Sequence, residues 1–204
     1  MSVRSTTRQG SFSRREIRDL LVAWAALGVA FTFFFARVRP ATISNYLVSS
    51  AFFLGLLVNL GTVGVGFLLH ELAHKAVATR YGQYAEFRAA YQMLALAVAG
   101  GLAGFIFAAP GAVYHRGQLS DARHGHVALA GPVTNLALAG LFVPVTAIAP
   151  MIGSRGVEIN LLLAAFNMLP VGGLDGQTVR QWSTPVFLLV FVPSVALALW
   201  MFFA

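Results

Sequence analysis

The chain has 204 residues, of which 58% are hydrophobic and only 10% are charged, and its mean hydropathy is +0.75. A soluble domain usually carries about 25% charged residues, so this composition excludes an ordinary soluble fold. The apolar runs are continuous rather than alternating, which indicates membrane-spanning helices and not a membrane β-barrel. We therefore expect an all-α polytopic membrane protein.

The net charge of +7 comes mainly from arginines near the N-terminus, as far as Arg18, and in short loops. Such a basic excess is typical of contact with lipid head groups and of the control of membrane topology. No nucleic-acid-binding motif is present, so the expected partner is the lipid bilayer and not a nucleic acid. Cysteine is absent, which excludes disulfides, a thiolate nucleophile and a cysteine-bound metal.

Residues 1–16 are polar and rich in Arg, Ser and Thr, and we expect them to form an N-terminal tail. Residues 17–204 are then a single transmembrane domain. The basic residues ahead of the apolar run 20–36 look like a secretory signal. That run lacks a clear small-x-small cleavage site near its end, so a retained membrane helix at about 18–38 is favoured.

Later apolar runs predict further crossings at about 43–81, 127–149, 157–170 and 184–203. At about 1.5 Å per residue, a helix over the first of these runs is longer than a bilayer is thick. It must therefore tilt, protrude or break, and Gly61, Gly64 and Gly66 are the candidate weak points.

The pattern His-Glu-x-x-His occupies residues 70–74 of that run. Residues four apart lie on the same face of a helix, so His70 and His74 can bind one zinc ion. Glu71 is then placed to hold a water molecule on the metal and take its proton. Ionisable side chains at membrane depth cost roughly 2.5–3.5 kcal/mol each and are usually functional, which favours a metal site over a merely interfacial position.

A catalytic zinc ion usually has three protein ligands, so a third donor is expected elsewhere in the chain. The other histidines are expected to be solvated, because they lie in a polar loop: His115, His124 and His126. The acidic candidates are Glu86, Asp121, Glu158 and Asp175.

Asp175 stands out because Pro170 and two glycines interrupt the apolar helix before it. Irregular backbone at membrane depth is tolerated only inside protein or beside a cavity, so this stretch can turn Asp175 back towards His70 and His74. A capping Asp before an ordinary turn is the alternative, and it is the commoner role for an isolated Asp-Gly pair.

Two motifs now resemble those of the site-2 proteases, zinc metalloproteases that cut inside membranes. Asn167-Met-Leu-Pro170-Val-Gly-Gly-Leu-Asp175-Gly176 matches the family signature Asn-x-x-Pro-x-x-x-x-Asp-Gly, and Gly131-Pro-Val-Thr-Asn135 is similar to its Gly-x-x-x-Asn element. The resemblance covers about residues 50–180. It indicates a compact member of the family without the PDZ or CBS domains that other members often carry.

The resemblance also implies roles for individual residues. His70, His74 and Asp175 would bind one Zn²⁺ ion, and Glu71 would be the general base. Asn167 would bind the substrate backbone or stabilise the oxyanion. For Asn135, substrate contact and an interhelical hydrogen bond are equally open.

Charge and geometry together constrain the topology. His74 and Asp175 must reach the same depth, which requires the segment 91–114 to dip into the membrane and return. With the N-terminus inside, this re-entrant arrangement leaves 11 of the 14 Lys and Arg residues inside, against nine for a full crossing. We therefore predict five to six transmembrane helices, counted as five crossings plus the re-entrant segment, with a cytoplasmic N-terminus in the cell membrane.

The leading functional hypothesis is an intramembrane zinc endopeptidase whose substrate is a transmembrane segment of another protein. A strand-like stretch at 111–114 is expected to pair with the unwound substrate. One alternative is a catalytically inactive relative that acts as a metal-binding scaffold or transport protein. Another is a different type of membrane zinc protease, with Glu158 as the third ligand.

Overall fold

The computed structural model describes residues 11–38, 40–105 and 110–203. The α-helices are α1 (Arg14–Ala36), α2 (Ile43–Leu47), α3 (Ser50–Asn59), α4 (Val65–Arg80), α5 (Tyr91–Ala103), α6 (Asp121–Phe142), α7 (Pro150–Asn167), α8 (Asp175–Trp182) and α9 (Thr184–Phe203). The shorter helical pieces are η1 (Pro40–Thr42), η2 (Leu60–Gly64) and η3 (Pro144–Ala147). Two strands are present among the described residues, β1 (Tyr84–Ala89) and β2 (Gly111–Arg116). The fold is helical as predicted, with the addition of this small sheet.

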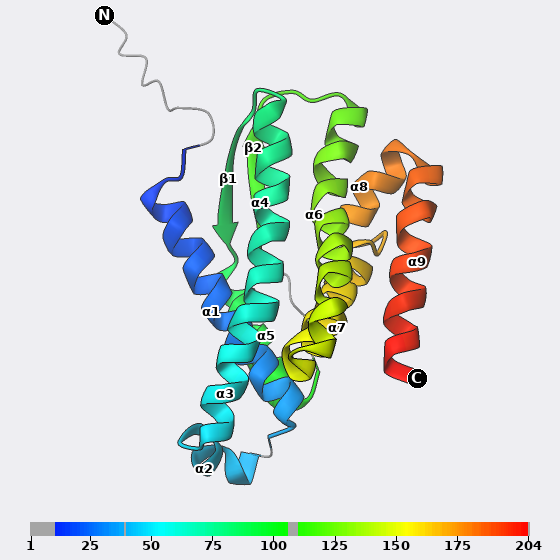
Figure 1. Ribbon diagram of the computed structural model, residues 1–204. Helices are drawn as coiled ribbons and strands as arrows, with labels where there is room; N and C mark the ends of the chain where they lie inside the picture. The colour runs from blue at the N-terminus through cyan, green and yellow to red at the C-terminus, as the bar shows by residue number, and fades with distance from the viewer. Residues whose placement is uncertain (1–10, 39, 106–109, 204) are drawn as a thin grey trace, which may run out of the picture.

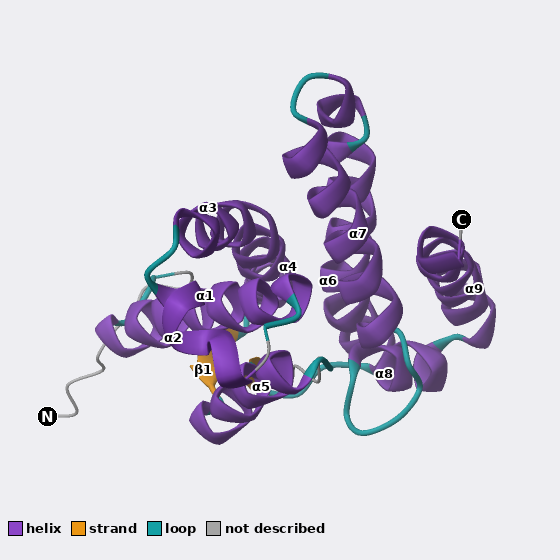
Figure 2. Cartoon of the chain, turned by 90° about the horizontal axis from the view of Figure 1, so that it is seen from below, coloured by secondary structure: helices purple, strands orange, loops and turns teal. Residues whose placement is uncertain are grey.

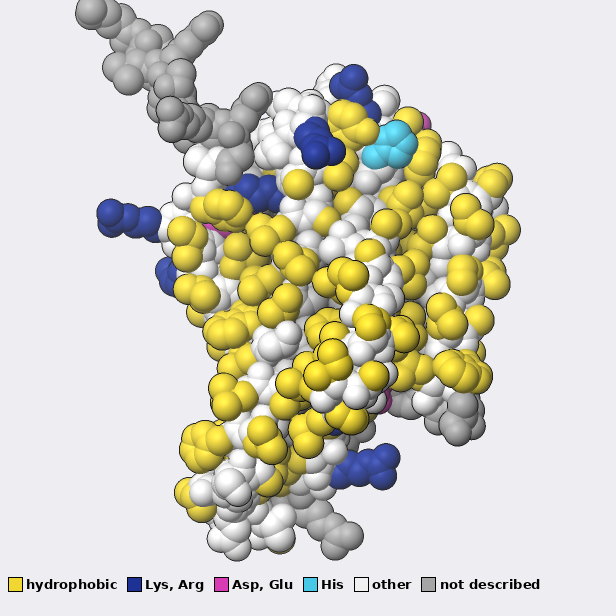
Figure 3. Space-filling model, viewed as in Figure 1, with side chains coloured by type: hydrophobic (Ala, Val, Ile, Leu, Met, Phe, Trp, Pro, Cys, Tyr) yellow, Lys and Arg dark blue, Asp and Glu magenta, His cyan; other side chains and the backbone are white. Residues whose placement is uncertain are grey.

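Four helical stretches of the described chain are long and apolar enough to cross a membrane: Arg14–Ala36, Ser50–Arg80, Asp121–Ala147 and Thr184–Met201. The crossing predicted at 157–170 overlaps α7, an 18-residue helix that begins seven residues earlier and ends at Asn167. It is less apolar than the other four because it carries Arg155, Glu158 and Asn160. Figure 3 shows that hydrophobic side chains cover most of the middle of this face of the molecule, with Lys and Arg side chains mainly towards its upper end.

Successive long helices run in alternating directions. In Figure 1, α1 runs downwards, α3 and α4 return, α6 runs downwards, α7 returns and α9 runs downwards. The start of α1 therefore lies in the upper half of this view and the end of α9 in the lower half, as an odd number of passes requires. Seen from below, α6, α7 and α9 stand beside a second group formed by α1, α3, α4 and α5 (Figure 2). Which end faces the cytoplasm remains a prediction.

The first helix begins earlier than its hydropathy suggests. Ser13 caps α1 by accepting a hydrogen bond from the Glu16 backbone N–H, at 3.0 Å. A serine in this position satisfies a backbone donor that the helix leaves unpaired, so the helix starts at Arg14 rather than near residue 18. Glu16 and Asp19 are buried, although the sequence places Glu16 in a polar tail. Residues 1–10 of that tail lie outside the described residues.

The long helical run at 43–81 is interrupted, as predicted from its length. A turn at Val48 and Ser49 separates α2 from α3, and η2 is a π-helical segment between α3 and α4. The Trp24 indole N–H donates to the Leu60 carbonyl at the start of η2, at 3.0 Å. A Cβ atom on Gly64 would lie 2.1 Å from the Trp24 ring, so only glycine allows α1 to approach here. The π-helical turn is thus held by a side chain from another helix.

The segment predicted to be re-entrant, 91–114, contains α5 and most of β2. The two strands are antiparallel, and Tyr84 pairs with Arg116 while Ala89 pairs with Gly111. The Ala90 N–H also donates to the Pro110 carbonyl, at 2.9 Å. The segment after Ala90 therefore begins and ends at the same side of the sheet, as the predicted re-entrant course requires. The apolar run predicted as one unit over 91–114 is divided into α5 and β2.

Two apolar clusters hold the helices around the site. The first joins α1, η2, α4 and β1 through Leu27, Phe31, Val63, Phe67 and Phe87. The second joins α6, α8 and α9 with the residue that follows α7, through Ala128, Met168, Val179 and Phe187. Helix α4 packs in the first cluster and α8 in the second, so the two clusters fix the helices that carry His70, His74 and Asp175.

Candidate metal centre

His70 and His74 project from the same face of α4, as their spacing predicts. Both side chains are buried, and their Nε2 atoms lie 2.9 Å apart. Their ring planes are nearly perpendicular, at 80°. Two histidine nitrogens therefore converge on one point beside the helix.

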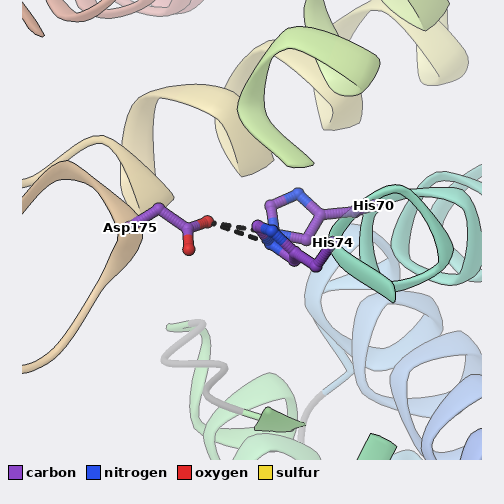
Figure 4. Close-up of side chains that lie close together, drawn as sticks. All are labelled: His70, His74 and Asp175. Carbon is purple, nitrogen blue, oxygen red and sulfur yellow. Dashed lines mark hydrogen bonds and ion pairs between the residues drawn. The ribbon is translucent and has the colours of Figure 1, made fainter. Parts of the chain in front are cut away.

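Asp175 reaches this point from the other side (Figure 4). It is the first residue of α8, and its Oδ2 lies 3.3 Å from Nε2 of His70 and 3.3 Å from Nε2 of His74. Gly172 and Gly173 precede it with φ values of 65° and 78°, a left-handed conformation that residues with a side chain rarely adopt. The two glycines therefore allow the tight turn that directs Asp175 back to α4, as the interrupted helix in the sequence predicts.

Hydrogen bonds on the far side of each ring determine which nitrogen faces Asp175. His70 Nδ1 lies 2.6 Å from Asn135 Oδ1, and His74 Nδ1 lies 2.7 Å from the Val127 carbonyl. A carbonyl oxygen only accepts, so both Nδ1 atoms carry the proton and donate. The Asn135 amide is itself oriented, because its Nδ2 donates to the Gly66 carbonyl and to Asn160 Oδ1. Both Nε2 atoms consequently present lone pairs.

The three ligating atoms fit a tetrahedral metal ion. His70, His74 and Asp175 form the one group of three or more metal-ligating side chains found among the described residues, with all ligand atoms within 4.8 Å. A zinc ion with bonds of about 2.0–2.1 Å keeps its ligands about 3.3 Å apart, close to the separations seen here. Two lone pairs and a carboxylate facing one another would repel without a cation, so the donor set suits a divalent metal. The far-side hydrogen bonds are those that orient histidine ligands in metal sites.

Gly131 of α6 makes room for the two imidazoles. A Cβ atom at this position would lie 2.5 Å from Nε2 of both His70 and His74. The glycine thus lets the α6 backbone pass directly against the metal-binding atoms. In the sequence, Gly131 is only one residue of the Gly-x-x-x-Asn element. Its spacing of one helical turn from Asn135 indicates that it lies on the same face of α6 and so next to His70.

Glu71 and Asn167 share a pocket of about 550 Å³ with the three candidate ligands. Glu71 is buried beside His70, whereas Asn167 is half-buried at the end of α7 and donates to the Leu163 carbonyl at 2.9 Å. Strand β2 forms another wall of this pocket, through residues 111–115. The pocket therefore places an acid, an amide and a strand around the candidate metal position.

Asn135 lies behind this site. It is 0% exposed, does not line the pocket and bonds to His70 from the side away from Asp175. Its position corresponds to the interhelical hydrogen bond and not to substrate contact. Asn160 of α7, which belongs to none of the sequence motifs, accepts a hydrogen bond from the Asn135 amide and completes this network.

The other polar candidates divide into two groups. Glu158 lies away from the site, in a separate pocket beside Arg37, and pairs with Arg155 at 3.7 Å, so it is not a third ligand here. His126 is hydrogen-bonded to Tyr81, with its Nδ1 atom 2.7 Å from the Tyr81 hydroxyl. By contrast, His115 and His124 line the main pocket, although the sequence suggests solvated loop positions for both.

Comparison with known proteins places the chain in a family. A Methanocaldococcus jannaschii protein named "Putative zinc metalloprotease MJ0611" is 39% identical over 200 residues, which cover 94% of this chain and 97% of that protein. The chain belongs to this zinc metalloprotease family. A Mycobacterium tuberculosis protein named "Putative zinc metalloprotease Rip3" is 31% identical over 172 residues, which cover 76% of this chain and 38% of that protein. No family model matches the chain, and no solved structure matches it.

Proposed function

We propose that the chain is an intramembrane zinc endopeptidase of the site-2 protease type, which cleaves transmembrane segments of other membrane proteins. One observation carries the proposal: His70 and His74, on a helix long enough to span a membrane, converge with the Asp175 carboxylate of α8 next to Glu71. His74 and His70 precede Arg80 by six and ten residues, which places them about 9–15 Å deeper along the helix.

The proposed chemistry assigns one task to each group. His70, His74 and Asp175 would hold the zinc ion, which when bound supplies a Lewis acid that acidifies water and polarises a carbonyl. Glu71 takes the proton from the attacking water and returns it to the leaving amide nitrogen. The side-chain amide of Asn167 has two N–H groups. One donates to the Leu163 carbonyl, and we propose that the other donates to the developing oxyanion.

The substrate must present an open backbone to these groups, because a helix hides its peptide carbonyls in its own hydrogen bonds. Strand β2 pairs with β1 along one edge and lines the pocket at residues 111–115. The carboxylates of Glu16 and Asp19 in turn accept backbone N–H groups of β1, at 3.0 and 3.3 Å. The sheet is thus held from the α1 side, and we infer that the unwound substrate adds to it on the pocket side.

Water also has to enter a site at this depth. The pocket wall includes several polar side chains besides those of the metal centre, namely Arg88, His115, His124 and Thr178. Their presence supports a polar route to the scissile bond within an otherwise apolar molecule.

The proposal is tested by measuring bound zinc and cleavage together. The wild type, Glu71→Gln and Asp175→Ala are purified in detergent and incubated with a model transmembrane segment. Glu71→Gln should keep its zinc and lose cleavage by about 10²–10⁴-fold, the usual contribution of a general base. Asp175→Ala should lose both. Glu158→Gln is the matched control, since that carboxylate lies in a different pocket.

Two outcomes would reject the mechanism. Cleavage that persists in Glu71→Gln removes the proposed base. A wild type that binds zinc and cleaves none of a panel of membrane segments would favour the inactive metal-binding relative instead.

A further inference from the structure

A second pair of histidines lines the same pocket as the three candidate ligands. His115 lies on β2 and His124 on the first turns of α6. Their ring centroids are 5.0 Å apart, with the planes at 51°. The corresponding distance between His70 and His74, whose Nε2 atoms converge on one point, is 4.6 Å. Two imidazoles at this separation are close enough for one ion to contact a nitrogen of each.

One nitrogen of this pair lacks a partner among the described residues. The Nδ1 atom of His115 is buried and has no hydrogen-bond partner in the described part of the chain. His126, two residues after His124, instead places its Nδ1 against the Tyr81 hydroxyl. Buried nitrogens are normally paired, so an unpartnered one on a pocket wall points to a missing ligand.

The ligand is a cation that accepts nitrogen lone pairs. Burial, and to a lesser extent the neighbouring His124, lower the pKa of His115, so its imidazole is neutral at pH 7 and offers a lone pair. Neutral imidazole suits zinc, copper and nickel, whereas magnesium and calcium prefer oxygen donors.

We propose that His115 and His124 form a second, weaker binding site for a divalent transition metal ion on the wall of the active-site pocket. Two protein ligands leave the remaining coordination positions to water, so the affinity is lower than that of a site with three ligands. The bound ion would join β2 to α6, two walls of the pocket that belong to different elements. If the chain cleaves membrane segments as proposed above, a metal ion that bridges β2 and α6 should inhibit cleavage when metal is in excess. The reason is that β2 lines the space that the substrate must enter.

The site is tested by metal titration of the zinc-loaded, untagged protein. Cu²⁺ or Ni²⁺ is added, and the stoichiometry, the affinity and the nitrogen hyperfine structure of the copper spectrum are measured. The wild type should bind one ion beyond its tightly held zinc. His115→Gln and His124→Gln should each weaken this second binding at least tenfold, while one zinc per chain remains as evidence of folding. His126→Gln, which changes a neighbouring histidine that does not line the pocket, should bind like the wild type.

Two results would overturn the proposal: a wild type that binds no second ion at millimolar metal, or unchanged second-ion affinity in both His115→Gln and His124→Gln. The inhibition by excess metal is a separate readout. If the second ion binds as proposed and the protein shows no proteolysis, the failure lies with the proposed function and not with this site.

Discussion

Asn135 Oδ1 accepts a hydrogen bond from His70 Nδ1 at 2.6 Å, and this bond directs the opposite nitrogen of His70 towards Asp175. Asn135 lies in the middle of α6 and is bonded in turn to α4 and α7. One buried amide therefore connects three helices and sets the tautomer of a candidate metal ligand.

Replacing Asn135 tests this arrangement. Asn135→Ala should lower zinc affinity about 10–100-fold, the usual effect of losing a group that orients a metal-bound histidine. Zinc content is measured after dialysis against graded chelator. Thr134→Ala is the control, since the Thr134 hydroxyl bonds only to the Ala130 carbonyl of its own helix in the described structure. Equal zinc affinity in the two variants would show that Asn135 does not orient His70.

The space at Gly131 gives a second prediction. Gly131→Ala should displace both imidazoles, because the added Cβ atom would lie 2.5 Å from their Nε2 atoms, and zinc occupancy should fall sharply. Gly140→Ala on the same helix is the matched control, as a Cβ atom there meets no atom within 4 Å among the described residues. Both variants are compared by zinc content and thermal unfolding. A Gly131→Ala protein with full zinc content contradicts the packing described here.

The π-helical turn ahead of the metal helix gives a third prediction. Trp24→Phe keeps the aromatic ring and removes only the N–H that donates to the Leu60 carbonyl. Losing one partner of such a bond costs about 1–3 kcal/mol when the other stays buried, so the melting temperature should fall. Trp200→Phe, at an exposed position on α9, should melt like the wild type. Identical melting of the two variants would show that the indole N–H does not hold η2.

A buried ion pair links the first helix to the metal helix. Glu16 contacts Lys75, the residue after His74, and also accepts the Phe87 backbone N–H of β1. Glu16→Gln leaves the Lys75 charge without its partner, which should destabilise the fold by about 3–5 kcal/mol. The double variant Glu16→Gln/Lys75→Met should recover part of that loss when unfolding is followed by denaturant titration. If the double variant is less stable than Glu16→Gln, Glu16 and Lys75 are not coupled in this way.

The sequence predicts what depends on local spacing. His70, Glu71 and His74 lie close together on one helix, and Pro170 with its glycines indicates the turn before Asp175. The remaining features depend on contacts between distant segments. Strand β1 is short, and it is stabilised by β2, which follows only after α5, and by two α1 carboxylates. Asn135 orients His70 and Glu16 pairs with Lys75 because particular helices pack together. The hydropathy of the sequence does not show which helices these are.

Intramembrane cleavage by a zinc site is tested most directly by mapping the cleaved bond in proteoliposomes. A substrate with one transmembrane segment is incubated with zinc-loaded wild type, with chelator-treated protein before and after zinc is restored, and with Glu71→Gln. Intramembrane zinc proteolysis predicts a cut inside the membrane segment, identified by mass spectrometry, which disappears with chelation, returns with zinc and is absent in Glu71→Gln. A cut that lies only outside the membrane segment, or one that Glu71→Gln still makes, would contradict intramembrane zinc proteolysis.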